Sequence, residues 1–94
     1  MYLHIGNNIV LKTQDIVGIF DLDTATISRF TRSFLSAAQK AGEVITVTNE
    51  LPKSFIVCKK KNSERKIYIS QISSSTLMRR FAINNNINSD RSKK

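Results

Sequence analysis

Residues 54–80 contain the pattern that decides the fold, and they read SFIVCKKKNSERKIYISQISSSTLMRR. Two short apolar runs, at residues 55–58 and 67–69, flank a polar segment with an Asn-Ser pair, which is typical of a β-hairpin. The turn of this hairpin carries five cations: Lys59, Lys60, Lys61, Arg65 and Lys66. Five positive charges at one turn exceed what solubility requires, so the hairpin indicates a surface for an anionic partner.

The positive charge of the whole chain lies in its second half. The 94 residues have a net charge of +8, and 40% of them are hydrophobic, which suits one small domain with a modest core. Residues 1–47 carry four basic and four acidic side chains, whereas residues 48–94 carry eleven basic and three acidic ones. The asymmetry favours an anionic partner for the second half. Solubility combined with a coding bias toward Lys and Asn is the alternative explanation.

Short β-prone runs separated by turn residues alternate with helical patterns along the chain. We expect strands at residues 2–5, 9–11, 16–22, 43–48, 55–58 and 67–69, and helices at about 24–41 and 73–82. Most connections are too short for parallel crossovers, so the predicted fold class is α+β with a mostly antiparallel sheet of about five or six short strands. One long amphipathic helix and a short C-terminal helix complete it, and the long helix allows one parallel pair. Residues 1–83 are expected to form a single domain, and residues 84–94 a disordered basic tail.

The long helix is predicted from an apolar stripe at helical spacing. Asp23 or Thr24 is the expected N-cap, and Gly42 the expected C-cap residue. The stripe consists of Ile27, Phe30, Phe34, Ala38 and Ala41, and we expect it to face the core. The basic residues of the opposite side, among them Arg29 and Arg32, are expected to be solvated.

The sequence contains no recognisable catalytic or metal-binding constellation, so an enzyme is not predicted and no cofactor or metal is expected. Cys58 is the single cysteine and sits in an apolar strand, where it is expected to behave as a small hydrophobe. His4 has no second histidine with which to share a metal, although its approach to Cys58 is not excluded. The N-terminus does not resemble a signal peptide, and no apolar run reaches the roughly 18 residues of a membrane span. A cytoplasmic protein with no membrane partner is expected.

The charge pattern predicts a DNA-binding protein that acts as a homo-oligomer. Lys and Arg bind phosphates regardless of base sequence, and a domain with a few usable cations binds DNA weakly unless several copies act together. No helix resembles a reader of the major groove, so DNA shape is the expected source of any specificity. The predicted phosphate contacts are Lys53, Lys59, Lys60, Lys61, Arg65, Lys66, Arg79 and Arg80. Arg79 and Arg80 also have a structural explanation, since arginines near a helix C-terminus interact favourably with its dipole.

Two motifs, LHIG at residues 3–6 and IYIS followed by SSSTL and an arginine at residues 67–79, resemble the RemA/RemB family of bacterial extracellular matrix regulatory proteins. The resemblance covers roughly residues 1–81. It implies a DNA-binding regulator of transcription of matrix and biofilm genes in Gram-positive bacteria. In RemA-like relatives it also implies a ring of identical subunits whose basic rim engages DNA.

The chain departs from the RemA-like pattern at positions that carry charge in that branch. RemA-like members have a pair of arginines where this chain has Glu50 and Leu51, with Lys53 as the nearest cation. Another basic position falls near Gln14 or Asp15. Either the cations have moved to the hairpin turn, or the protein is an interaction or assembly module that partners a RemA-like paralogue without binding DNA directly.

Overall fold

The computed structural model describes residues 1–22 and 28–93, with side chains described through residue 83. Within these residues the chain forms six strands, two α-helices and a short 3₁₀ helix. Their order is β1 (Tyr2–Gly6), β2 (Ile9–Lys12), η1 (Thr13–Asp15), β3 (Ile16–Asp21), α1 (Arg29–Lys40), β4 (Val44–Thr46), β5 (Ser54–Lys59), β6 (Arg65–Ser70) and α2 (Ser74–Lys93). No helix of the described part is long and apolar enough to cross a membrane.

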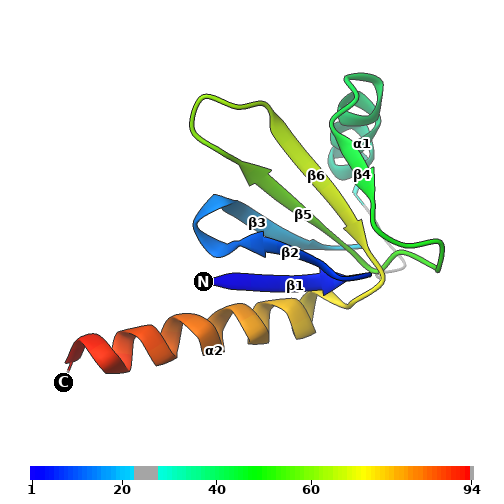
Figure 1. Cartoon of the computed structure of the whole chain (residues 1–94). Coiled ribbons are helices and arrows are strands. Elements are labelled where there is room, and N and C mark those ends of the chain that lie inside the picture. The colour runs from blue at the N-terminus through cyan, green and yellow to red at the C-terminus, as the bar shows by residue number, and fades with distance from the viewer. Residues whose placement is uncertain (23–27, 94) are drawn as a thin grey trace.

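The strands of the described residues form two sheets, a four-stranded one in the order β3-β5-β6-β4 and a two-stranded one made of β1 and β2 (Figure 1). All pairs are antiparallel except β4 with β6. The α+β class and the mostly antiparallel pairing are therefore confirmed, but the single predicted sheet is wrong. The tight turn after β1, where Gly6, Asn7 and Asn8 have positive φ, lets β1 and β2 pair with each other. The β1–β2 hairpin then lies across the large sheet instead of extending its edge.

Strand β5 is the centre of the fold because both of its faces are buried. On one face, Ile56 and Cys58 pack against Leu3 and Leu11 of the β1–β2 hairpin and against Leu77 of α2. On the other face, the core consists of Phe55, Val57, Ile67 and the α1 residue Ala38. A strand between two neighbours and two covering layers reads as a continuous apolar run, which is why residues 55–58 do not alternate.

Helix α1 begins later than the sequence predicts. Its N-cap is Ser28, whose hydroxyl accepts a hydrogen bond from the Thr31 backbone amide at 3.1 Å. The predicted caps Asp23 and Thr24 and the stripe residue Ile27 lie outside the described residues. The helix ends as predicted, with Gly42 in the left-handed region at φ 74° just after it.

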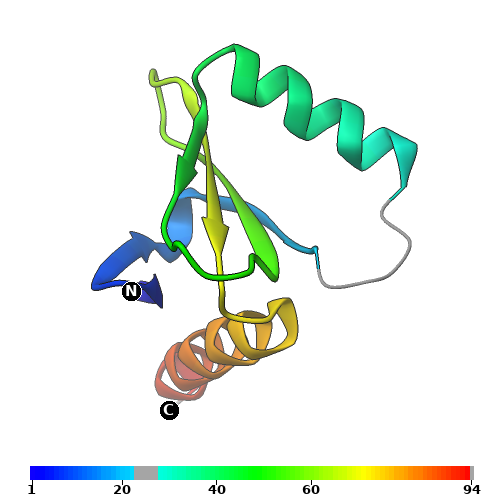
Figure 2. The same ribbon diagram turned by 90° about the vertical axis from the view of Figure 1, so that its right-hand side faces the viewer.

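The prediction that the whole stripe faces the core is wrong at two of its residues: Phe30 is 83% exposed, and Ala41, directly after α1, is exposed as well. Ala38 is 1% exposed and Phe34 is half-buried, so the helix meets the sheet through its second half. Figure 2 shows α1 diverging from the sheet toward its N-terminal end. An open groove separates the start of the helix from β3 and β5, which leaves Phe30 uncovered.

Helix α2 is longer than the predicted short helix. Ser73 precedes it and accepts a hydrogen bond from the Thr76 backbone amide, and Leu77 in its first turns is fully buried. The helix runs beside β1 and continues past it to Lys93 (Figure 1), although a disordered tail is predicted at residues 84–94. The predicted boundary between a domain at residues 1–83 and a tail at residues 84–94 stays a prediction.

Candidate anion-binding surface at the β5–β6 hairpin

The predicted hairpin turn is present, and it holds two lysines at its tip. Lys59 pairs with Arg65 at the last rung, and Asn62 adopts a positive φ of 62° in the turn. The Lys59 ammonium donates hydrogen bonds to the backbone carbonyls of Lys60 and Ser63. All three lysines of the turn are exposed, but the ammonium group of Lys59 is engaged by these carbonyls, whereas Lys60 and Lys61 extend from the tip.

The alternation of side chains along a strand places the hairpin cations on different faces of the sheet. Arg65 lies on the α1 face, where its Nη2 contacts the Glu43 carboxylate at 2.8 Å. Its guanidinium carbon also lies 4.9 Å from the centre of the Phe34 ring. These contacts connect β6 to α1 and to the start of β4, and a phosphate contact from Arg65 would compete with them.

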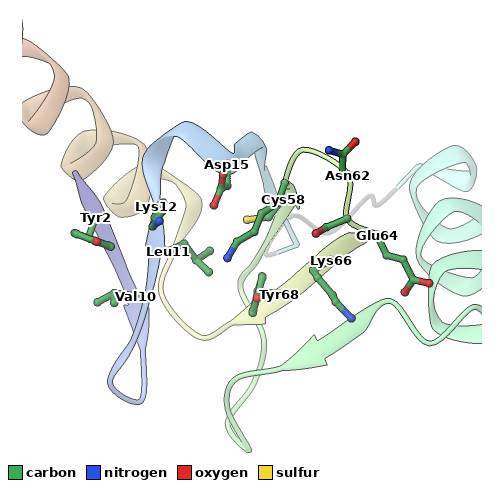
Figure 3. Close-up of a pocket in the computed structure, with 12 residues that line it drawn as sticks. Tyr2, Val10, Leu11, Lys12, Asp15, Cys58, Asn62, Glu64, Lys66 and Tyr68 are labelled. Atoms are coloured by element: carbon green, nitrogen blue, oxygen red, sulfur yellow. The ribbon is translucent and has the colours of Figure 1, made fainter.

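Lys66 lies on the opposite face, where a concave pocket of about 660 Å³ separates the β1–β2 hairpin from the β5–β6 hairpin. Figure 3 shows Tyr2, Leu11 and Lys12 along one wall and Cys58, Lys66 and Tyr68 along the other. Lys60 of the turn also lines the pocket. Three lysines from separate segments of the chain thus border one hollow.

Lys12 is the residue of this surface that the sequence analysis missed. It belongs to the first half of the chain, whose charges balance, and nothing in its local sequence distinguishes it. Its place follows from the packing of the β1–β2 hairpin across the large sheet, since Lys12 pairs with Tyr2 at the open end of that hairpin. Tertiary packing, rather than a motif, brings Lys12 to the pocket that Lys60 and Lys66 also line.

The pocket contains a thiol, but the surroundings make it unreactive. Burial, with a smaller contribution from the Asp15 carboxylate, raises the pKa of the Cys58 thiol to about 11, although Lys60 acts in the opposite direction. Burial and the neighbouring Cys58 likewise raise the pKa of the Tyr68 hydroxyl. Both groups are neutral near pH 7, so the lysines and the two carboxylates of Asp15 and Glu64 supply the charges of the pocket.

The structure does not form a His–Cys pair. Leu3 and Ile5 face the core from β1, and His4 between them is exposed on the other side of the strand. Among the residues that the structure describes, no group of three His, Cys, Asp or Glu side chains could hold a metal ion.

The remaining predicted phosphate contacts lie away from the hairpin tip. Lys53 precedes β5 at the other end of the strand, and six residues at about 3.3 Å each separate it from the tip by roughly 20 Å. Arg79 and Arg80 are exposed on α2, where Arg80 donates to the His4 carbonyl at 3.3 Å. The eight predicted cations therefore occupy three places on the subunit and do not form one patch.

A second surface feature is an open apolar groove of about 460 Å³ between α1 and strands β3 and β5. Phe30, Val17 and Phe20 border it and are 83%, 68% and 45% exposed. Phe20 stacks on Phe55 with ring centres 4.9 Å apart. Gly18 makes this stacking possible, because a Cβ atom there would lie only 2.6 Å from the Phe20 ring.

Comparisons with known proteins agree on one family. A family model described as "RemA-like: Extracellular matrix regulatory protein A-like" matches residues 2–81. The chain is also 40% identical over 80 residues to a protein of Bacillus subtilis (strain 168) named "Extracellular matrix regulatory protein B". The matched region covers 85% of this chain and 89% of that relative.

Proposed function

The chain belongs to the RemA-like family of extracellular matrix regulatory proteins, and from this premise we propose that it regulates matrix and biofilm genes by binding DNA as a homo-oligomer. The observation that carries the proposal is the group of lysines at the β5–β6 tip and around the adjoining pocket. Lys60 and Lys61 project from the turn, and Lys66 and Lys12 follow on the face of the adjoining pocket. We name Lys12, Lys60, Lys61 and Lys66 the basic tip.

The basic tip suits contacts to phosphates without base readout. Each neutralised phosphate of duplex DNA releases counterions and contributes about −0.9 to the slope of log K against log salt. A single subunit with a few such contacts binds weakly at physiological salt. Several subunits that present their tips together gain affinity through effective concentration.

The apolar groove supports self-association. A small monomeric protein rarely exposes several large aromatic and aliphatic side chains beside one another, and such patches mark surfaces that another protein covers. Phe30 is nearly fully exposed next to the hollow that Val17 and Phe20 border. A second subunit is the occupant that the homo-oligomer hypothesis assigns to this groove.

A salt series of DNA binding tests the proposal. We would measure binding of a fluorescent duplex by anisotropy between low and physiological salt, for the wild type and for a Lys60→Gln/Lys61→Gln variant. The variant should bind all duplexes more weakly and show a slope shallower by about 1.8 for each engaged subunit. An Arg32→Gln/Lys40→Gln variant is the matched control, because it loses the same charge from the exposed side of α1. Affinity that is independent of salt, or equal loss in both variants, would exclude the basic tip as the DNA contact.

The alternative function is an assembly module that partners a RemA-like subunit and does not bind DNA. The same groove favours it, because an apolar surface accepts a paralogue as well as a second copy. Chromatography with light scattering, with and without duplex DNA and with a RemA-like protein, separates the two functions. A complex that forms only with the paralogue, together with no DNA binding at low salt, would support the alternative.

A further inference from the structure

We propose that the concave pocket between the β1–β2 and β5–β6 hairpins binds a nucleoside mono- or diphosphate, and that this ligand weakens DNA binding. The second half of the proposal rests on the proposed function, whereas the binding itself does not.

The pocket has the size of a small-molecule site. Its volume of about 660 Å³ lies within the range of roughly 300–1,000 Å³ that ligand pockets occupy. Paired strands form its walls, with Tyr2 opposite Lys12 on one side and Cys58 opposite Lys66 on the other. A pocket of this size between two hairpins has room for one nucleotide. A DNA duplex is too wide to enter it and would contact projecting surfaces such as the hairpin tip.

Three lysines line the pocket together with the carboxylates of Asp15 and Glu64, and the remaining net positive charge favours an anionic group such as a phosphate. Lys12, Lys60 and Lys66 belong to β2, the β5–β6 turn and β6, so the fold gathers them from three segments. Lysine side chains are long and flexible, which allows their ammonium groups to converge on one anion at the mouth of the pocket. A phosphate or diphosphate with two or three negative charges neutralises such a group better than a single carboxylate does.

The interior of the pocket favours a planar ring attached to that phosphate. Tyr68 contributes an aromatic ring, Leu11 and the neutral Cys58 contribute an apolar floor, and Tyr2, which is 59% exposed, adds a second ring at the rim. Bases stack on tyrosine rings with little dependence on base identity, because every base has a π face. The Asp15 carboxylate lies at the same pocket and is an acceptor for an amino group of a base or a ribose hydroxyl.

A ligand in the pocket would act on the DNA-binding surface because the two sites share lysines. Lys12, Lys60 and Lys66 belong to the basic tip and also line the pocket. A bound nucleotide occupies their ammonium groups and adds negative charge a few residues from Lys61. Both effects oppose a DNA phosphate at the tip, so nucleotide and DNA compete.

Calorimetric titration of the full chain with ADP, UDP and pyrophosphate tests the binding. At least one nucleotide should bind with one site per chain and at least about tenfold more tightly than pyrophosphate, since stacking adds to the phosphate contact. Lys12→Gln should weaken nucleotide binding about tenfold, because it removes a charged contact from an exposed position. Lys61→Gln is the matched control, since Lys61 lies on the same turn but does not line the pocket, and its nucleotide affinity should be unchanged.

Three results would overturn the inference: no nucleotide binding by folded protein, pyrophosphate binding as tight as that of both nucleotides, or equal losses in Lys12→Gln and Lys61→Gln. Anisotropy of a labelled duplex, with and without saturating nucleotide, tests the competition. If the duplex binds and nucleotide does not displace it, the regulatory half is wrong. If no duplex binds at all, the proposed function fails, while the calorimetric result still decides the pocket.

Discussion

Replacing Arg65 with Gln should lower the stability of the protein without removing the proposed DNA binding. Arg65 contacts Glu43 at 2.8 Å, and the two side chains are 40% and 19% exposed, so the ion pair contributes about 0.5–1 kcal/mol after solvent screening. The contact with the Phe34 ring adds about 0.5–1 kcal/mol. The Arg65 Nε atom is buried without a hydrogen-bond partner in the described part of the chain, which offsets part of this gain.

The expected net loss of unfolding free energy is therefore about 1 kcal/mol, which lowers the Tm of a chain of this length by about 4–8 °C. Urea unfolding and thermal melts followed by circular dichroism measure it. Lys66→Gln is the control at the next residue on the opposite face of β6: it should leave the Tm within about 2 °C and weaken DNA binding. If Arg65→Gln left the stability unchanged and abolished DNA binding, the structural role assigned to Arg65 would be wrong.

Three further perturbations have defined outcomes. Leu77→Ala should lower the unfolding free energy by about 2–5 kcal/mol in urea titrations, because this fully buried side chain joins α2 to the core; an unchanged midpoint would contradict that packing. Phe30→Ser should shift the mass measured by light scattering toward the monomer without lowering the Tm, since the ring is 83% exposed. An unchanged mass would show that the interface does not include Phe30. The raised pKa of Cys58 predicts full stability below pH 9.0, the thiol's ordinary value, and a progressive loss as the pH rises to about 11; Cys58→Ala should show a smaller loss, because only Tyr68, whose pKa is also raised, still contributes, and an equal loss in both proteins would contradict the assignment.

Local patterns were sufficient to predict the strands. The apolar runs of β5 and β6, the Gly6-Asn7-Asn8 turn of the first hairpin and Gly42 after α1 each have a local physical cause, and all are present in the structure. The division into two sheets has no local cause. The division depends on which surface packs against the apolar face formed by Leu3, Ile5 and Leu11. Only the complete fold determines that surface.

The helix stripe shows the same limit. Periodicity identified the apolar side of α1, but it did not reveal that the sheet covers only part of the helix. Phe30 therefore fits the pattern of a core residue and is exposed in the subunit. Burial in the proposed homo-oligomer would account for both the pattern and the exposure.

Charge counting located the basic turn but not the role of each cation. Because side chains alternate along β6, Arg65 faces α1 and forms an ion pair within the fold. Lys59 donates a hydrogen bond to a backbone carbonyl of the turn. The pocket adds Lys12, which no pattern near it in the sequence indicates. A surface built from separate segments can be predicted only in part from the residues of one segment.

Lysine acetylation footprinting tests the central claim most directly. The protein would be acetylated briefly with and without saturating duplex DNA at low salt, and the modified lysines quantified by mass spectrometry. We expect DNA to protect Lys60, Lys61 and Lys66 several-fold and to leave Lys40 on α1 unprotected. Equal protection of all four lysines, or protection of Lys40 alone, would contradict the assignment of the β5–β6 tip as the DNA-binding surface.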